Sequence, residues 1–185
     1  MASILLHNCT LIDGTGVDPI RRQSVIVENG HIVKVGSVES VGRPVDAEVL
    51  DLSGMTLLPG LTDAHVHLGW VGTNGIDLPP NDRDGGSLAV YAIRVIENAK
   101  LALEEGFTTV RDAGGLDPAF ADAVARGLIE GPRILPAASF ISQTGGHGDH
   151  RSRNDDSIPK AIPGLLALPC LADGVDSMRA AVRKQ

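Results

Sequence analysis

Aromatic side chains are scarce in this chain of 185 residues, where three phenylalanines, one tyrosine and one tryptophan make up 3% of the sequence. Basic residues are in the minority too, because 16 lysines and arginines stand against 23 aspartates and glutamates, a formal net charge of −7. Surfaces that bind nucleic acid combine a basic stripe with aromatic side chains on which bases stack. We therefore expect no nucleic-acid partner.

Long apolar runs are absent as well, although 43% of the residues are hydrophobic. A membrane-spanning helix needs about 20 consecutive apolar residues, so we expect no membrane partner. The N-terminus lacks the basic and apolar segments of a secretory signal. Cys9 and Cys170 form no Cys-x-x-Cys motif and are expected to be free thiols. Together these features predict a cytoplasmic protein.

Two histidines two residues apart are the most informative feature that is present. His65 and His67 lie in residues 59–67, PGLTDAHVH, directly after a short apolar run. Alternate side chains of a β-strand share one face, so Asp63, His65 and His67 would project to the same side. Neutral imidazole is the commonest protein ligand of zinc, and a catalytic zinc takes about three protein ligands. His65 and His67 are therefore predicted metal ligands that need partners from elsewhere.

Residues 58–67 resemble the metal-binding signature of the amidohydrolase superfamily. The similarity continues through residues 106–112, GFTTVRD, which resemble the second barrel strand of that family, and through an N-terminal segment that resembles its small β-domain. The resemblance implies a (β/α)8 barrel of the TIM type with an accessory β-sandwich. It also implies a divalent metal as cofactor, zinc above all, as one or two ions.

The length of the chain conflicts with a whole barrel. A (β/α)8 barrel takes roughly 250 residues, whereas residues 57–185 leave room for about three of its eight β/α units. We therefore predict an α/β fold with an incomplete barrel, 57–185, after a small β-sandwich-type domain, 1–56. The family's later ligands, a bridging lysine, two single histidines and an aspartate, have no counterpart here, and Lys184 lies on an expected helix. The general base and bridging ligand are thus expected beyond residue 185, no catalytic residue is assigned, and the chain is expected to be an N-terminal fragment.

Residues 1–56 alternate short apolar runs with turn residues. Asn29 and Gly30, placed between two such runs, predict a β-hairpin with a two-residue turn. His7 and His31 belong to the same unit. Neither has a second candidate ligand close by in the sequence, and we expect neither to bind metal.

Strands and helices alternate in the second part of the chain, which predicts a parallel sheet. The expected elements are a rim loop over 69–86, a helix over 88–105 with Val90, Ile93, Ile96, Leu101 and Leu103 on its apolar face, a strand over 108–112, a helix opened by Asp117-Pro118 and closed by Gly131-Pro132, a strand over 134–138 and a final helix capped by Asp176.

Strand 108–112 runs into glycines, as a barrel strand does where it exposes active-site groups. Arg111 and Asp112 are therefore candidate functional residues. Neighbours on a strand point to opposite faces, so at most one of the two faces the barrel interior. We expect an internal ion pair or a brace between loops, and we do not expect Asp112 to bind metal.

Residues 142–151, SQTGGHGDHR, form a loop rich in glycine, imidazole and carboxylate after the third expected strand. Glycines let a backbone approach a substrate closely. The loop resembles the equivalent segment of amidohydrolases that act on dipeptide-like amides, notably Xaa-Pro dipeptidases. This resemblance implies that His147 and His150 contact substrate, and the alternative is that both are simply exposed to solvent.

Three interpretations of function stay open. The resemblance implies metal-assisted hydrolysis of a C–N bond in a small peptide-like or cyclic amide substrate, in which the cation lowers the pKa of bound water. A fragment with only a partial metal site would instead be non-catalytic, and its unpaired sheet edge would favour self-association or a complementing C-terminal segment. A small α/β binding domain is the third, although the glycines include no phosphate-binding loop.

Overall fold

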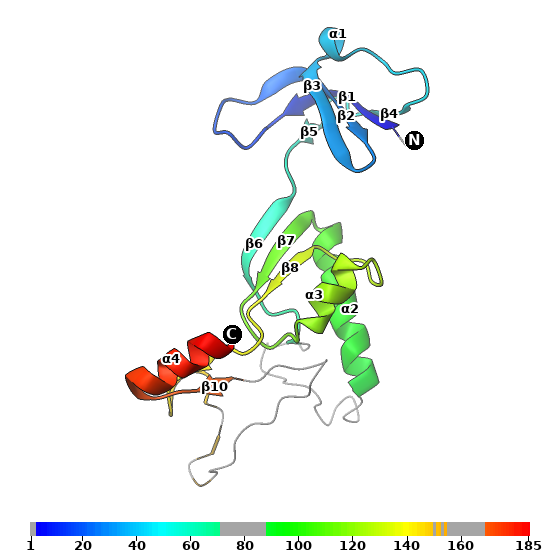
Figure 1. Ribbon diagram of the computed structural model, residues 1–185. Coiled ribbons are helices and arrows are strands. Elements are labelled where there is room, and N and C mark those ends of the chain that lie inside the picture. The colour runs from blue at the N-terminus through cyan, green and yellow to red at the C-terminus, as the bar shows by residue number, and fades with distance from the viewer. Residues whose placement is uncertain (1–2, 71–87, 150, 153, 155–168) are drawn as a thin grey trace. The chain divides into compact units, whose positions relative to one another are not determined.

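The computed structural model describes residues 3–70, 88–149, 151–152, 154 and 169–185 (Figure 1). They form two compact units, Met1–Pro59 and Gly60–Gln185. Most of the expected rim loop, together with His150, lies outside the described residues. Within the described ranges, no helix combines the length and the apolar character that crossing a bilayer demands.

The first unit is a small mixed β-sheet. Its elements are β1 (Ser3–Leu11), β2 (Ile20–Glu28), β3 (His31–Ser37), the short helix α1 (Val38–Val41), β4 (Glu48–Asp51) and β5 (Thr56–Leu57). The strand order is β3-β2-β1-β4, and β5 pairs with β1. β1 runs antiparallel to β2 and parallel to β4. Leu5, Ile26 and Val41 form the buried core of this unit.

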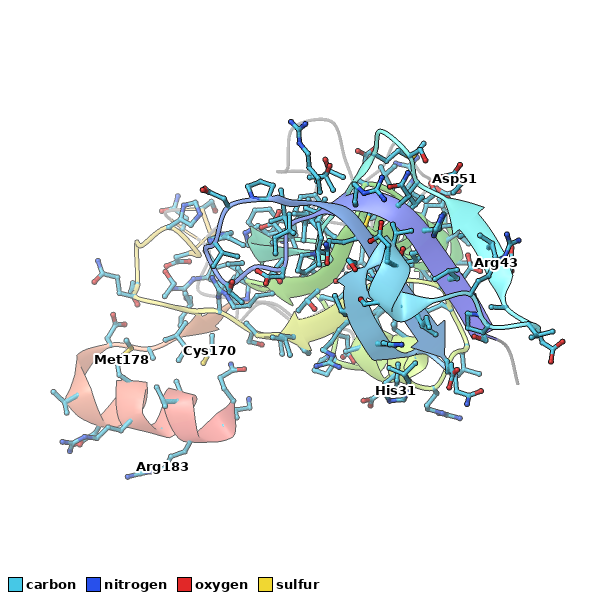
Figure 2. All side chains as sticks on the ribbon, turned by 90° about the horizontal axis from the view of Figure 1, so that it is seen from above. His31, Arg43, Asp51, Cys170, Met178 and Arg183 are labelled. Atoms are coloured by element: carbon cyan, nitrogen blue, oxygen red, sulfur yellow. The ribbon has the colours of Figure 1, made fainter. Side chains whose placement is uncertain are left out.

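The β2–β3 hairpin forms as predicted. Asn29 and Gly30 have φ angles of 51° and 77°, the left-handed conformation that a two-residue turn of this kind requires. His31 is exposed at the end of the hairpin, and its Nδ1 lies 3.0 Å from the Asn29 carbonyl oxygen (Figure 2). The other histidine of this unit, His7, has its Nδ1 3.3 Å from the hydroxyl of Ser24, which is fully buried.

The second unit confirms the predicted alternation of strands and helices. Its elements are β6 (Leu61–Val66), α2 (Leu88–Glu104), β7 (Phe107–Asp112), α3 (Ala119–Ala125), β8 (Arg133–Pro136), β9 (Ile141–Ser142), β10 (Cys170–Leu171) and α4 (Gly174–Lys184). β6, β7 and β8 form a parallel sheet in that order, and β9 pairs with β10. α2 and α3 lie along one face of the three-stranded sheet (Figure 1). The fold class of this unit is therefore α/β.

The face of α2 that packs on the sheet agrees with the predicted one only in part, because Ile96 packs against the core as expected but the fully buried positions are others. Its buried positions are spaced four residues apart: Tyr91, Val95 and Ala99. They belong to one cluster with Val110 and Leu116, both fully buried. Ile93 and Leu101, which we expected to face the core, are 55% and 54% exposed. The residues at i, i+4 and i+8 thus define the packed face.

Two predicted helix limits are wrong. α3 ends at Ala125, well before Gly131-Pro132, because Gly127 adopts a φ of 68° and its N–H donates to the Val124 carbonyl. α4 begins at Gly174 with Asp173 at the N-cap position, so Asp176 lies in the first turn instead of before it. The expectation of free thiols is confirmed for Cys9 and Cys170.

Candidate metal centre

The two histidines of the His-x-His motif lie at the carboxyl end of β6. His65 is within the strand, and His67 follows its last residue. Their imidazole rings have centroids 5.2 Å apart, so the rings lie together, as the two-residue period of a strand predicts. Asp63 acts locally, because its Oδ1 accepts the backbone N–H of His65 at 2.9 Å.

The ring of His67 is fixed by two contacts. Its Nδ1 lies 2.9 Å from the carbonyl oxygen of Gly114. A carbonyl oxygen only accepts, so Nδ1 is the donor, and in the neutral ring Nε2 then keeps the lone pair. The indole of Trp70 stacks on the same ring, with centroids 3.8 Å apart and planes 5° from parallel. Metal-binding histidines typically donate their other ring N–H to a carbonyl or carboxylate, and His67 has that arrangement.

Asp112 is a fully buried carboxylate at the end of β7. Its Oδ2 accepts the N–H of Leu68 at 2.7 Å, and its Oδ1 accepts the N–H of Gly114 at 3.0 Å. Burial raises the pKa of this carboxyl above its ordinary value, although these N–H donors and the nearby His67 pull it down. Asp112 thus ties the segment after β6 to the segment after β7, which confirms the predicted brace between loops.

The glycines after β7 make room for two aromatic side chains. A Cβ on Gly114 would lie 2.5 Å from Cδ1 of Phe140, and a Cβ on Gly115 would lie 2.6 Å from Nε1 of Trp70. Both glycines also have positive φ angles, 137° and 99°. The Trp70 and Phe140 rings in turn meet edge to face, with centroids 6.5 Å apart. Small residues here allow the aromatic group to pack beside His67.

Arg111 is exposed, unlike its neighbour Asp112, and its Nε donates to the carbonyl oxygen of Ala64 at 2.6 Å. It therefore braces β6 against β7. Asn98 of α2 makes a similar contact, because its Nδ2 donates to the Leu68 carbonyl at 3.1 Å. Sequence reasoning missed both Asn98 and Trp70. The only available signal was that the sole tryptophan follows His67 by three residues.

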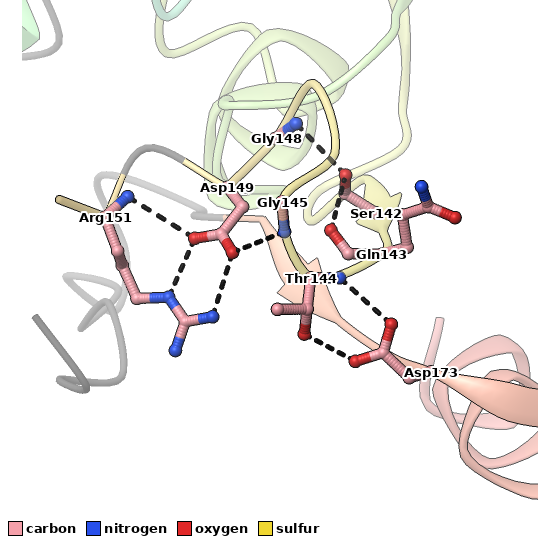
Figure 3. A network of polar contacts seen from close by, with 8 residues as sticks. All are labelled: Ser142, Gln143, Thr144, Gly145, Gly148, Asp149, Arg151 and Asp173. Atoms are coloured by element: carbon pink, nitrogen blue, oxygen red, sulfur yellow. Dashed lines mark hydrogen bonds and ion pairs between the residues drawn. The ribbon is translucent and has the colours of Figure 1, made fainter. Parts of the chain in front are cut away.

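The loop after β9 is held by two aspartates (Figure 3). Asp149 accepts two hydrogen bonds from the Arg151 guanidinium, at 2.7 and 2.9 Å, and one from the Gly145 N–H at 2.8 Å. The bond from Arg151 and then that from Gly145 hold the pKa of Asp149 well below its usual range. Asp173 accepts bonds from both the N–H and the hydroxyl of Thr144.

His147 lies exposed in this loop. The hydroxyl of Ser142 accepts the N–H of Gly148 at 3.0 Å, so the turn that contains His147 is closed on itself (Figure 3). Contact of His147 with substrate stays a prediction. The same holds for His150, which lies outside the described residues.

No third ligand accompanies the histidine pair among the residues that the structure describes, where no group of three or more His, Cys, Asp or Glu side chains could hold a metal ion. The structure brings His65 and His67 together. His147 belongs to no cluster of three or more candidate metal ligands among the described residues. The donor chemistry fits a divalent cation, since the hydrogen bond at Nδ1 of His67 reserves Nε2 for a ligand. Metal binding by the pair stays a prediction.

The sequence profile of the Amidohydrolase family matches residues 56–185. The chain therefore belongs to the amidohydrolase family, which confirms the resemblance that residues 58–67 indicated. A curated relative, ochratoxinase from Aspergillus niger, is 31% identical over 194 aligned residues, which cover 98% of this chain and 39% of the relative.

Two solved structures are also similar over 99% of this chain. A prolidase in complex with N-methylphosphonate-L-proline has a TM-score of 0.78 at 34% identity and is covered to 43% of its length. A Xaa-Pro dipeptidase with methionine bound in its active site has a TM-score of 0.77 at 28% identity and is covered to 44%. The chain spans less than half the length of these relatives.

Proposed function

We propose that this chain carries the first ligands of the metal centre of a hydrolase that cleaves a C–N bond in a small amide. The observation that carries the proposal is the 2.9 Å contact between Nδ1 of His67 and the Gly114 carbonyl, which favours a proton on Nδ1 and leaves Nε2 available beside the ring of His65. Membership of the amidohydrolase family supports it. His65 and His67 are the proposed ligands of a divalent cation, and zinc is the first candidate because imidazole is its commonest nitrogen ligand.

The chemistry of such a centre divides between cation and protein. A divalent cation held there would polarise the scissile carbonyl and lower the pKa of water. His67 supplies a lone pair in a fixed direction, because Gly114 and Trp70 hold its ring. Arg111 and Asp112 keep the ends of β6 and β7 in place. No described residue is assigned as general base.

The proposed architecture is the start of a TIM-type barrel over 57–185, about three β/α units, after a β-sandwich-type domain over 1–56. The parallel order β6-β7-β8 with α2 and α3 on one face supports it. β6 and β8 are the outer strands of this sheet, and Leu61 and Leu135 on them are 42% and 52% exposed. We propose that a complementing C-terminal segment or a second copy covers them.

Size-exclusion chromatography with light scattering tests that proposal. Association or a soluble complex with the complementing segment is expected, and a monodisperse monomer that melts cooperatively would contradict it.

The proposed substrate is a dipeptide-like amide. The similarity to a prolidase and to a Xaa-Pro dipeptidase supports this class. His147 is exposed on a loop that Asp149 and Asp173 hold in place. Both His147 and His150 are proposed to contact substrate.

The experiment measures bound zinc and hydrolysis of Xaa-Pro and N-acyl dipeptides by the chain, by the His65→Ala, His67→Ala double variant, and by His31→Ala. His31 is a matched control because it is an exposed histidine in the other unit. Zinc lost in the double variant and kept in the control would support the metal centre. Zinc retained by the double variant would refute it.

The second candidate is a chain that binds metal weakly and does not turn over substrate by itself. The absence of a third ligand among the described residues favours it. The same experiment separates the two candidates, because zinc binding with hydrolysis excludes the second, whereas weak zinc binding without hydrolysis is what the second predicts.

A further inference from the structure

Gly114 connects His67 to the buried carboxylate of Asp112. The carbonyl of Gly114 accepts Nδ1–H of His67 at 2.9 Å, and its N–H donates to Oδ1 of Asp112 at 3.0 Å. The N–H of Gly115, which belongs to the same peptide group as that carbonyl, donates to the Ala138 carbonyl at 3.0 Å. The acceptor for His67 is therefore held on both sides.

We propose that Asp112 is a positioning residue that selects the tautomer of His67 by fixing Gly114. Gly114 has a φ of 137°, a conformation that glycine adopts readily because it has no Cβ. A glycine backbone has few intrinsic restraints of its own. Asp112 supplies the missing restraint, because its two oxygens bond the N–H groups of Leu68 and Gly114 simultaneously. Leu68 directly follows His67, so the same carboxylate holds both the backbone of the histidine segment and the acceptor for its ring.

The burial of Asp112 makes this role specific. With no solvent exposure, its oxygens have no water to exchange for their backbone N–H donors, which include Leu116 as well as Leu68 and Gly114. An amide in place of the carboxylate has one acceptor oxygen and one NH2 donor. Asp112→Asn would thus set a donor against at least one of these backbone N–H groups and release its segment. The inference rests on the proposed function only in taking His67 as a metal ligand.

The test reads the tautomer directly in the metal-free chain. Long-range 1H–15N correlation of histidine-labelled protein distinguishes a protonated ring nitrogen from an unprotonated one, and loss of a signal in His67→Gln assigns it. The wild-type chain is expected to have Nδ1–H and an unprotonated Nε2 at His67. Asp112→Asn is expected to shift His67 toward a mixture of both tautomers. An Nε2–H tautomer in the wild type, or an unchanged tautomer in a folded Asp112→Asn variant, overturns the inference.

Asp117→Asn is the matched control. The Asp117 carboxylate also accepts a backbone N–H after β7, that of Ala119 at 2.9 Å. It is expected to leave the His67 tautomer unchanged, and an equal shift in this control would mean that any lost carboxylate loosens the region. Asp112→Ser, which lacks the opposing amide, replaces Asp112→Asn where the latter loses its native spectrum. In the wild type the Gly114 amide must also exchange slowly with solvent, and fast exchange contradicts the inference whatever the variants do.

Zinc affinity provides a second readout. Loss of a group that orients a metal ligand typically weakens metal binding about 10- to 100-fold, and we expect Asp112→Asn to fall in that range by competition with a chromophoric chelator. If the wild-type chain binds no zinc, the proposed function fails while the tautomer measurement still decides the role of Asp112. If zinc binds equally to wild type and Asp112→Asn, the positioning role fails and the metal centre stands.

Discussion

The indole of Trp70 stacks on the imidazole of His67, with ring centroids 3.8 Å apart and planes 5° from parallel. Such an aromatic contact contributes about 0.5–1.5 kcal/mol beyond the area that it buries. It also covers one face of a candidate metal ligand. The stack therefore connects the only tryptophan of the chain to the proposed chemistry.

Trp70 should report metal binding by its fluorescence. Trp70 is the sole tryptophan, so all indole emission comes from a side chain that is stacked on the His67 ring. We expect Zn²⁺ to change this emission in the wild-type chain and in His31→Ala, and to leave it unchanged in His67→Ala. Unchanged wild-type emission with one equivalent of zinc bound would place the metal elsewhere.

Replacing Gly115 should destabilise the chain and disturb Trp70. Gly115→Ala adds a Cβ at 2.6 Å from the indole nitrogen on a backbone with φ of 99°, and such backbone strain alone costs about 1–3 kcal/mol. Gly127→Ala is the control, because Gly127 has a φ of 68° but no atom near its Cβ position. Chemical denaturation should show a larger loss for Gly115→Ala, with altered tryptophan emission only in that variant. Equal losses would mean that the contact with Trp70 contributes nothing.

Tyr91 should resist ionisation. Burial, and then the negative charges of Asp112 and Asp117, raise its pKa well above the ordinary value of 10.0. Because the native state then holds its proton where the unfolded state releases it, the free energy of unfolding should fall as pH rises above 10. Tyr91 is the only tyrosine, so tyrosinate absorbance measures it alone. A native titration midpoint near 10 would show that the side chain is open to solvent.

Asp149 should stay ionised far into acid. Its bonds from Arg151 and Gly145 lower its pKa below the ordinary 3.8, so the unfolded state binds more protons than the native state at low pH. The stabilisation is fully present above pH 3.8 and is lost as the pH falls from there toward the native pKa. Carbon-13 NMR of the carboxyl group should show this, and Arg151→Met should return the titration toward 3.8. Arg126→Met, on the helix α3 side of the unit, should leave it unchanged.

Local signals in the sequence predicted local structure well. Asn29 and Gly30 predicted their turn because only left-handed residues fit it, and the strand period predicted that the rings of His65 and His67 lie together. The fold class followed in the same way from alternating strand and helix patterns.

The contacts that fix the site could not be read from the sequence in the same way. Asp112 meets Leu68 across 44 positions of the chain, and only the parallel pairing of β6 with β7 brings them together. The predicted apolar face of α2 was wrong at Ile93 and Leu101 for a related reason. Its packed stripe, through Tyr91 and Val95, depends on the neighbours it meets rather than on its own apolar content.

Asp173 stands where a carboxylate usually caps the first turn of a helix, yet it makes no side-chain cap to α4, and both its oxygens bond Thr144 instead. The loop that exposes His147 and the start of an 11-residue helix consequently share Asp173 as an anchor, beside the pairing of β9 with β10. A molecule that displaces Thr144 would therefore either break its bonds to Asp173 or move the first turn of α4. A ligand that binds at His147 and displaces this loop would then also move the start of α4, because Asp173 connects the two.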